Sequence, residues 1–233
     1  RGFPVSWFSS FVVFQFRGFP VSWKAICYLS TCLLLLILFW QGPPRRSILS
    51  MTNSNATVVF ETPRLWVGHW HSSLAESALA IYGDPKVTQW IGGVTETGIA
   101  GMENRIAWLL ARNETLPDCW GSWPTFLKQT NQLVGAMLMK PLPDGEGNFT
   151  EEIEVGWHLA PAHWGQGYAT EGGRRMIELG FADQNLEQVF AVTGPNNQKS
   201  QRVARRLGMK AQGLTDKYYG QTVELFKITS DQC

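Results

Sequence analysis

The stretch "EVGWHLAPAHWGQGYATE", residues 154–171, decides which fold the chain can adopt. Its first part alternates apolar and polar residues, which is typical of a β-strand with one apolar face. Its last part changes to helical spacing from about Ala169, and Gly165 and Gly167 lie at the change. The sequence therefore predicts a strand, a short glycine loop and a helix in succession.

The glycine loop has the features of an anion-binding site. The first N–H groups of a helix lack acceptors within the helix and lie at its positive end, so they can bind a phosphate. Glycine suits such a loop, because a Cβ would block the ligand and because the loop can require φ values that other residues resist. The same residues also fit a tight strand-to-helix turn without a ligand.

Two other kinds of phosphate loop are disfavoured. A dinucleotide-binding loop would require a third small residue where Thr170 stands and an acidic residue at the end of the next strand, which ends instead in Thr193 and Gly194. A P-loop would require Gly-Lys-Ser or Gly-Lys-Thr, and neither tripeptide occurs in the sequence.

The remaining pattern alternates strands and helices. We expect one bent strand or a strand pair at 57–70, a hairpin of strands 122–128 and 132–140, and further strands at 152–159, 188–194 and 223–229. We expect helices at 74–83, capped by Ser72 or Ser73, at 96–112, from about 169, and at 197–208, capped by Asn196 or Asn197. Residues 141–150 are expected to form a loop. This order predicts an α/β fold with a mixed sheet flanked by helices.

Composition excludes several classes of partner. The formal net charge of the 233 residues is +1, which gives no broad basic surface for nucleic acid. Four cysteines, Cys27, Cys32, Cys119 and Cys233, are too few and too irregularly spaced for a disulfide framework or a zinc site. We therefore expect reduced thiols, no metal, and no nucleic acid as main partner.

Residues 1–50 differ from the rest. The heptapeptide "RGFPVSW" occurs at 1–7 and again at 17–23, and an apolar run follows at 25–40. We interpret residues 1–50 as an extension and expect the catalytic domain to span 51–233. The protein is then expected in the cytoplasm, with membrane contact only if the apolar run is a genuine anchor; a secretory signal is a further alternative.

Several motifs together resemble the GNAT family of N-acetyltransferases, in the branch typified by the ribosomal-protein alanine acetyltransferases RimJ and RimL. "ETPRL" at 61–65 is similar to the opening of that branch, and "DPKVTQWIGG" at 84–93 to its segment after the first helix. The stretch "EVGWHLAPAHWGQGYATEGGRRM" at 154–176 resembles its acetyl-CoA motif, and "NNQKSQRVARRLGM" at 196–209 its next helix. The resemblance covers about residues 61–229.

The resemblance implies a mixed sheet that splays around acetyl-CoA between strands 152–159 and 188–194. It implies that the diphosphate lies on the N–H groups of residues 165–170 and that pantetheine pairs with the strand edge near His158 and Leu159. The implied cofactor-binding residues are Leu159, Trp164, Gly165, Gln166, Gly167, Tyr168, Ala169, Thr170, Asn197 and Ser200. It further implies an amine acceptor, a small molecule or a peptide.

Acetyl transfer requires a neutral amine and a route for its proton. Glu154 is our candidate base, acting through a water molecule, because it shares a strand face with His158 just before the glycine loop. His158 is a second candidate for moving the proton. Many family members carry a tyrosine acid where this chain has Ala204, so Tyr218 and Tyr219 are the candidates that could take its place.

The missing tyrosine at Ala204 keeps open an alternative function, a noncatalytic module that binds acyl-CoA. A second alternative is a membrane-tethered interaction protein, in which residues 25–40 are the essential part. Fold alone does not decide between such functions.

Overall fold

The computed structural model describes residues 58–92, 95–117 and 120–232, which belong to one compact unit, Ile48–Cys233. The extension 1–50, its apolar run and the expected domain start at Met51 lie outside the described residues. Within the described ranges, no helix combines the length and the apolar character needed to span a bilayer.

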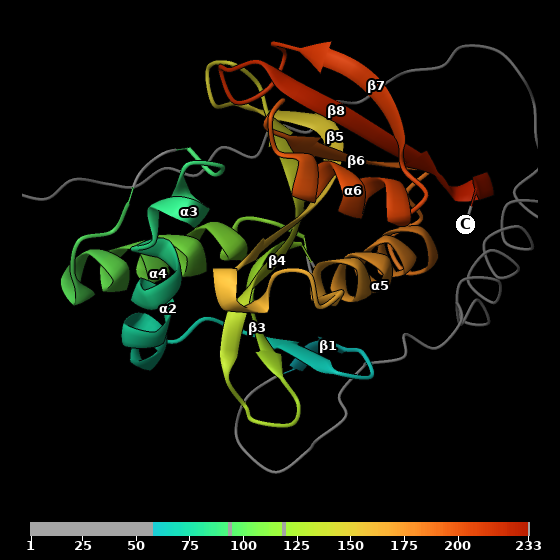
Figure 1. The fold of residues 1–233 in the computed structure, drawn as a ribbon. Coiled ribbons are helices and arrows are strands. Elements are labelled where there is room, and N and C mark those ends of the chain that lie inside the picture. Colours follow the sequence, from blue (N-terminus) through green and yellow to red (C-terminus); the bar gives the residue numbers. More distant parts are fainter. Residues whose placement is uncertain (1–57, 93–94, 118–119, 233) are drawn as a thin grey trace, which may run out of the picture. The chain divides into compact units, whose positions relative to one another are not determined.

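A single mixed sheet forms the framework (Figure 1). Its strands are β1 Val58–Glu61, β2 Leu65–Gly68, β3 Gly121–Leu127, β4 Leu133–Pro143, β5 Phe149–Leu159, β6 Gln188–Thr193, β7 Lys210–Thr215 and β8 Val223–Thr229. They lie in the order β1-β2-β3-β4-β5-β6-β8-β7. β5 and β6 run parallel, and the other neighbouring strands pair antiparallel. The predicted α/β fold with a mixed sheet is confirmed.

The helices flank this sheet (Figure 1). They are the 3₁₀ turns η1 Ser72–Leu74, η2 Pro161–His163 and η3 Ser230–Gln232, and the α-helices α2 Ala75–Tyr82, α3 Pro85–Thr88, α4 Ile99–Glu114, α5 Tyr168–Ala182 and α6 Gln198–Arg206. The short helix α3 was not predicted: Pro85 occupies its first turn and the Asp84 carboxylate accepts the Lys86 N–H at 2.8 Å.

Other local expectations changed in detail. Within the expected segment 57–70, residues 58–68 form the strand pair β1 and β2, joined by a tight turn. The expected cap at Ser72 or Ser73 is replaced by the His71 ring, which accepts the Ser73 N–H at 3.2 Å. The expected loop at 141–150 is mostly strand, because β4 and β5 extend almost to the turn around Asp144. β7 was missed because its exposed residues show no alternation.

Apolar clusters cover both faces of the sheet, and β4 contributes to both. Met137 and Met139 pack with Met176 of α5 on one face. Ala136 packs with residues of α2 and α4 on the other. Of the β5 residues that sequence alternation assigns to a polar face, Glu154 is buried, at 4% exposed, and His158 is half-buried. The carboxylate of Glu154 is therefore inside the protein, where it pairs with Lys140, rather than in solvent.

Candidate active site

The glycine loop enters α5 with a left-handed backbone. Gly165 has φ +76°, and Gly167, the residue that caps α5, has φ +84°. Residues with a Cβ rarely adopt these angles. In the structure as it stands, a Cβ at Gly165 would meet no heavy atom of the described residues within 4 Å. The backbone angle therefore favours glycine there, and the space beside it is open.

The loop presents unpaired N–H groups at the start of α5. Among the described residues, the N–H groups of Gly165, Gln166 and Gly167 donate to no acceptor. The next three residues form the first turn of the helix, where N–H groups have no intrahelical partner. The Glu171 N–H is the first to bond back, to the Gly167 carbonyl at 2.9 Å. A run of free donors at a helix N-terminus fits the two phosphates of a diphosphate.

A cavity of about 770 Å³ lies over this loop. Of the cofactor residues implied by the sequence, the cavity lining includes Leu159, Trp164, Gly165, Gly167, Tyr168, Ala169, Thr170, Asn197 and Ser200. Gln166 lies outside the lining: its carbonyl accepts a hydrogen bond from Arg64 and its side chain donates to the Ala162 carbonyl. Val87 of α3 and Trp90, which follows α3, were not predicted as part of the lining.

Next to the cavity, β5 and β6 diverge. Their parallel pairing is limited to Glu154 opposite Phe190. Beyond that point, residues 155–159 have no strand partner on the β6 side within the described part of the chain. An extended ligand with amide groups can bind such a free edge as an additional strand. The geometry thus fits the amide-containing arm of coenzyme A, with its diphosphate on the glycine loop.

Three further contacts shape the cavity wall. The Trp164 indole donates to the Leu159 carbonyl at 2.7 Å, and the Lys199 ammonium lies 4.4 Å from the centre of the Trp164 ring. The Asn197 side chain accepts the Ser200 N–H at 3.1 Å and so caps α6. These contacts hold the end of β5 and the start of α6 in place on either side of the cavity.

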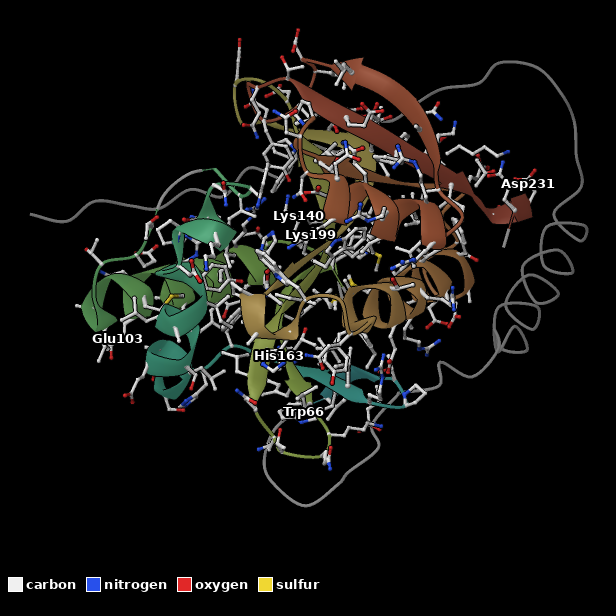
Figure 2. The ribbon with its side chains drawn as sticks, in the orientation of Figure 1. Trp66, Glu103, Lys140, His163, Lys199 and Asp231 are labelled. Carbon is white, nitrogen blue, oxygen red and sulfur yellow. The ribbon has the colours of Figure 1, made fainter. Side chains whose placement is uncertain are left out.

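Glu154 belongs to a buried polar cluster on the face of the sheet toward α4. It forms an ion pair with Lys140, directly opposite on β4, and accepts a hydrogen bond from the Tyr219 hydroxyl. Lys140 also donates to that hydroxyl, at 2.7 Å. Figure 2 shows Lys140 in the interior, whereas Glu103 and Asp231 lie at the periphery. The cluster holds a carboxylate, an ammonium and a phenol within direct contact.

Burial fixes the protonation of the phenol. Burial raises the pKa of Tyr219, and the Glu154 carboxylate raises it further, so the hydroxyl remains protonated. Burial lowers the pKa of Lys140, and the attraction of Glu154 opposes that change. Tyr219 can therefore act as a hydrogen-bond donor while Glu154 accepts.

His158 lies farther along the same strand face, half-buried, with its ring edge-on to Tyr82 at a centroid distance of 6.2 Å. Burial, with a smaller contribution from Arg105 and Lys140, lowers the pKa of His158 to about 4. The imidazole is therefore neutral at pH 7. It lines the same cavity as the glycine loop.

The two candidate tyrosines separate in the structure. Tyr218 is buried in a small apolar cluster with Leu142, Phe190 and Val223. Tyr219 has φ +60°, and its hydroxyl donates a hydrogen bond to Glu154. The structure thus brings together Glu154 and Tyr219, and it places Tyr218 in a packing role.

Sequence reasoning missed Lys140 and Arg64. Lys140 ends an apolar run that was expected to be a strand, and a lysine in such a run is a signal that it has a buried partner. Arg64 lies in the motif "ETPRL" and contacts Gln166 and Glu171 of the glycine loop and helix. Within the described ranges, no three His, Cys, Asp or Glu side chains gather as possible metal ligands.

Comparisons with known proteins agree with this geometry. A family model described as "Acetyltransferase (GNAT) domain" matches residues 64–210. The chain is 24% identical over 171 residues to the uncharacterized N-acetyltransferase p20 of Bacillus licheniformis, covering 72% of this chain and 93% of that protein. It is 32% identical over 105 residues to the FsC-acetyl coenzyme A-N(2)-transacetylase of Aspergillus fumigatus, covering 44% of this chain and 43% of that protein.

A solved structure gives the same fold. RimL, described as a ribosomal L7/L12 alpha-N-protein acetyltransferase in complex with coenzyme A, superposes with a TM-score of 0.60 at 13% identity. The superposition covers 76% of this chain and 99% of that structure.

Proposed function

The chain belongs to the GNAT family of acetyltransferases, in its RimJ/RimL-like branch, and from that premise we propose that it acetylates the primary amine of a protein N-terminus or of a small molecule. It is an N-acetyltransferase, as its family and its relatives are. The family takes the acetyl group from acetyl-CoA. The proposal concerns the acceptor and the residues that act on it.

The observation that carries the proposal is the free edge of β5 beside the unpaired N–H groups of residues 165–170. Acetyl-CoA, when bound, supplies a thioester whose carbonyl carbon can be attacked by an amine. The loop would hold the diphosphate, and the edge from 155 to 159 would hold the pantetheine amides. This arrangement would direct the thioester toward the splay point at Glu154.

Glu154 is the group that we assign to the acceptor amine. In the transfer, the amine nitrogen forms a bond to the acetyl carbon and the carbon–sulfur bond breaks, leaving a thiolate. The proton lost by the nitrogen would pass through a water molecule to Glu154. Lys140 and Tyr219, which both contact the carboxylate and each other, would hold it in a fixed orientation.

The acceptor class follows from the chemistry of amines and from relatives. An α-amine with a reference pKa of about 7.7 to 8.0 is partly neutral at physiological pH, whereas a lysine amine near 10.4 is almost fully protonated. RimL is described as an alpha-N-protein acetyltransferase, and the Aspergillus relative as an N(2)-transacetylase. The description of RimL supports a protein α-amine as the first class to test.

The test is thiol release from acetyl-CoA in the presence of a panel of amines, from N-terminal peptides to polyamines and aminoglycosides. We expect saturable release with at least one α-amine and about a hundredfold lower kcat in Glu154→Gln. Binding of acetyl-CoA without release for any amine would instead favour a noncatalytic acyl-CoA-binding module. Equal kcat in Glu154→Gln would refute the assignment of the base.

A further inference from the structure

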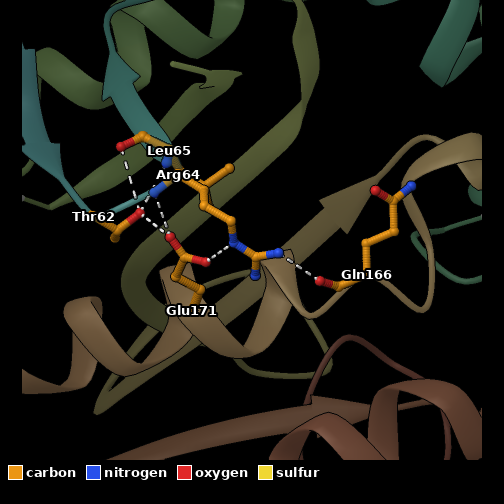
Figure 3. A network of polar contacts seen from close by, with 5 residues as sticks. All are labelled: Thr62, Arg64, Leu65, Gln166 and Glu171. Atoms are coloured by element: carbon orange, nitrogen blue, oxygen red, sulfur yellow. Dashed lines mark hydrogen bonds and ion pairs between the residues drawn. The ribbon is translucent and has the colours of Figure 1, made fainter. Parts of the chain in front are cut away.

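The motif "ETPRL" at 61–65 forms the turn between β1 and β2, far from the cavity in sequence but against the start of α5 (Figure 3). The turn is held internally: the Thr62 N–H donates to the Leu65 carbonyl at 2.9 Å, and the Leu65 N–H donates to the Thr62 hydroxyl at 3.0 Å. It therefore presents Thr62 and Arg64 in a fixed orientation.

Glu171, in the first turn of α5, receives three hydrogen bonds from this turn (Figure 3). The Thr62 hydroxyl and the Arg64 backbone N–H donate to one carboxylate oxygen, at 2.6 and 2.8 Å. The Arg64 Nε donates to the other oxygen at 2.6 Å. Although burial opposes the shift, the hydrogen bonds from Thr62 and Arg64 lower the pKa of Glu171, so the carboxylate stays ionised.

Arg64 also reaches the glycine loop. Its Nη1 donates to the Gln166 carbonyl at 3.0 Å, and its guanidinium carbon lies 4.5 Å from the centre of the Tyr168 ring. One guanidinium thus joins the helix, through Glu171, to the loop, through Gln166.

The bond to the Gln166 carbonyl sets the direction of an N–H group. In a trans peptide the C=O and the following N–H point in opposite directions across the peptide plane. Gln166 lies outside the cavity lining and Gly167 is part of it. Holding the Gln166 carbonyl toward Arg64 therefore turns the Gly167 N–H away from Arg64, toward the cavity side of the loop.

Arg64 also compensates a charge. Glu171 is an anion next to the N-terminal end of α5, where it would repel a bound diphosphate. The ion pair with Arg64 reduces that repulsion without placing Arg64 in the cavity lining.

We propose that Arg64 and Glu171 are positioning residues for the diphosphate of acetyl-CoA: their clamp fixes the Gln166–Gly167 peptide so that its N–H faces the cavity before the cofactor binds. The inference rests on the proposed function, because it assumes that acetyl-CoA uses this loop. It assigns a task to the "ETPRL" motif that the chemistry at Glu154 does not explain.

The test compares two acetyl donors, acetyl-CoA and S-acetylpantetheine, which has the thioester arm but no diphosphate. We expect kcat/KM for acetyl-CoA to fall about tenfold in Arg64→Ala and in Glu171→Gln, since each loses charge-assisted hydrogen bonds. For S-acetylpantetheine, kcat/KM should stay at the wild-type value. Arg64→Lys keeps the charge without the planar fork and should recover only part of the loss.

Lys128→Met is the matched control. The Lys128 ammonium lies 2.8 Å from the carboxylate of Glu61, which belongs to the same motif. The Lys128 side chain is partly exposed, as that of Arg64 is, but it does not contact the glycine loop. Its variant should leave both donors unaffected. Equal losses for both donors in Arg64→Ala, or no loss for either, would overturn the clamp. If the wild-type protein instead uses S-acetylpantetheine and acetyl-CoA equally well, that result would refute the assignment of a diphosphate site, and with it the proposed use of the loop.

Discussion

The glycine loop and the cluster around Glu154 differ in how their polar groups are paired. The loop at 165–170 is made of backbone donors left without partners, open to a cavity of about 770 Å³. The cluster is made of side chains whose charges are satisfied among themselves, with Lys140 7% and Glu154 4% exposed. We propose that the first binds an anion from outside, whereas the second pairs a carboxylate with an ammonium group inside the protein.

The difference has a physical origin. Backbone N–H groups carry only partial charges, so they can remain unpaired at a helix end in contact with solvent. A buried carboxylate without a partner would cost several kcal/mol, so it requires Lys140 or an equivalent cation. Damage to the loop should therefore affect ligand binding with little loss of stability. Damage to the cluster should affect both stability and turnover.

The largest expected effect on the binding of coenzyme A comes from the loop. Gly165→Glu places a long anionic side chain beside the unpaired N–H groups that we propose bind phosphate, at a residue with φ +76°. We predict that the dissociation constant for coenzyme A rises at least about a hundredfold, because bulk and like charge both oppose binding. Isothermal titration with coenzyme A measures this directly.

Gly165→Ala separates the effect of the backbone angle from the effect of a long anionic side chain. Its Cβ would meet no described heavy atom within 4 Å, so the variant mainly tests the backbone angle, at a cost of about 1 kcal/mol in stability. It should retain most of the affinity. If Gly165→Glu binds coenzyme A as wild type does, the loop is not the phosphate site.

The next effect is on the cluster. Glu154→Gln leaves the Lys140 ammonium buried without a carboxylate, and we predict a loss of about 3 to 5 kcal/mol in the free energy of unfolding. Turnover should fall as well, while the affinity for coenzyme A, measured below the unfolding transition, stays within about threefold. Urea unfolding and titration calorimetry check these expectations.

The double variant Glu154→Gln with Lys140→Met removes both charges. It should recover most of the stability, because no uncompensated charge then remains buried. It should not recover turnover. Recovery of turnover in the double variant would show that Glu154 has only a structural part.

Local signals were sufficient for the loop and for most of the fold. The alternation in 152–159 and the helical spacing after Ala169 predicted β5 and α5, and two glycines marked the loop between them. The same reasoning missed β7, whose side chains are exposed and irregular, and α3, which is only a turn long. Short or two-sided elements depend on contacts that the local sequence does not contain.

The cluster could be predicted only in part. Alternation placed Glu154 on one face of a strand, but it did not indicate that α4 covers that face. The partner of Glu154 is fourteen residues away on β4, and Tyr219 is sixty-five residues away. Strand register and the course of a loop decide such contacts, and the one visible sign was a lysine at the end of an apolar run.

A smaller effect concerns His158, whose pKa of about 4 lies below the unfolded value of about 6.5. As the pH falls, the unfolded chain therefore binds a proton at His158 before the folded protein does. The contribution of His158 to the free energy of unfolding is thus present above pH 6.5 and is lost between pH 6.5 and 4. We predict that His158→Gln flattens the pH dependence of the unfolding free energy in that window, by up to about 3 kcal/mol.

Urea unfolding at pH 7 and pH 4.5, in wild type and His158→Gln, measures this. The carboxylates that also titrate in the window are common to both proteins, so the difference between the two slopes isolates the histidine. An identical slope in the two proteins would mean that His158 is accessible to protons in the folded state.

The smallest expected effect concerns Asn197 in the cavity wall. The Asn197 side chain caps α6 through the Ser200 N–H, and Asn197→Ala should cost about 1 kcal/mol in the free energy of unfolding. Asn197→Asp keeps an acceptor at the same place and should lose only a few tenths of that. If both variants lose the same stability, the cap contributes little.

The most direct test of the central claim is a crystal structure of the protein with coenzyme A. We predict that oxygens of the diphosphate lie about 3 Å from the backbone nitrogens of Gly165, Gly167 and Ala169, with the pantetheine arm along residues 155–159. A diphosphate bound elsewhere, or a loop whose own N–H groups have turned to bond carbonyls of the chain, would contradict it.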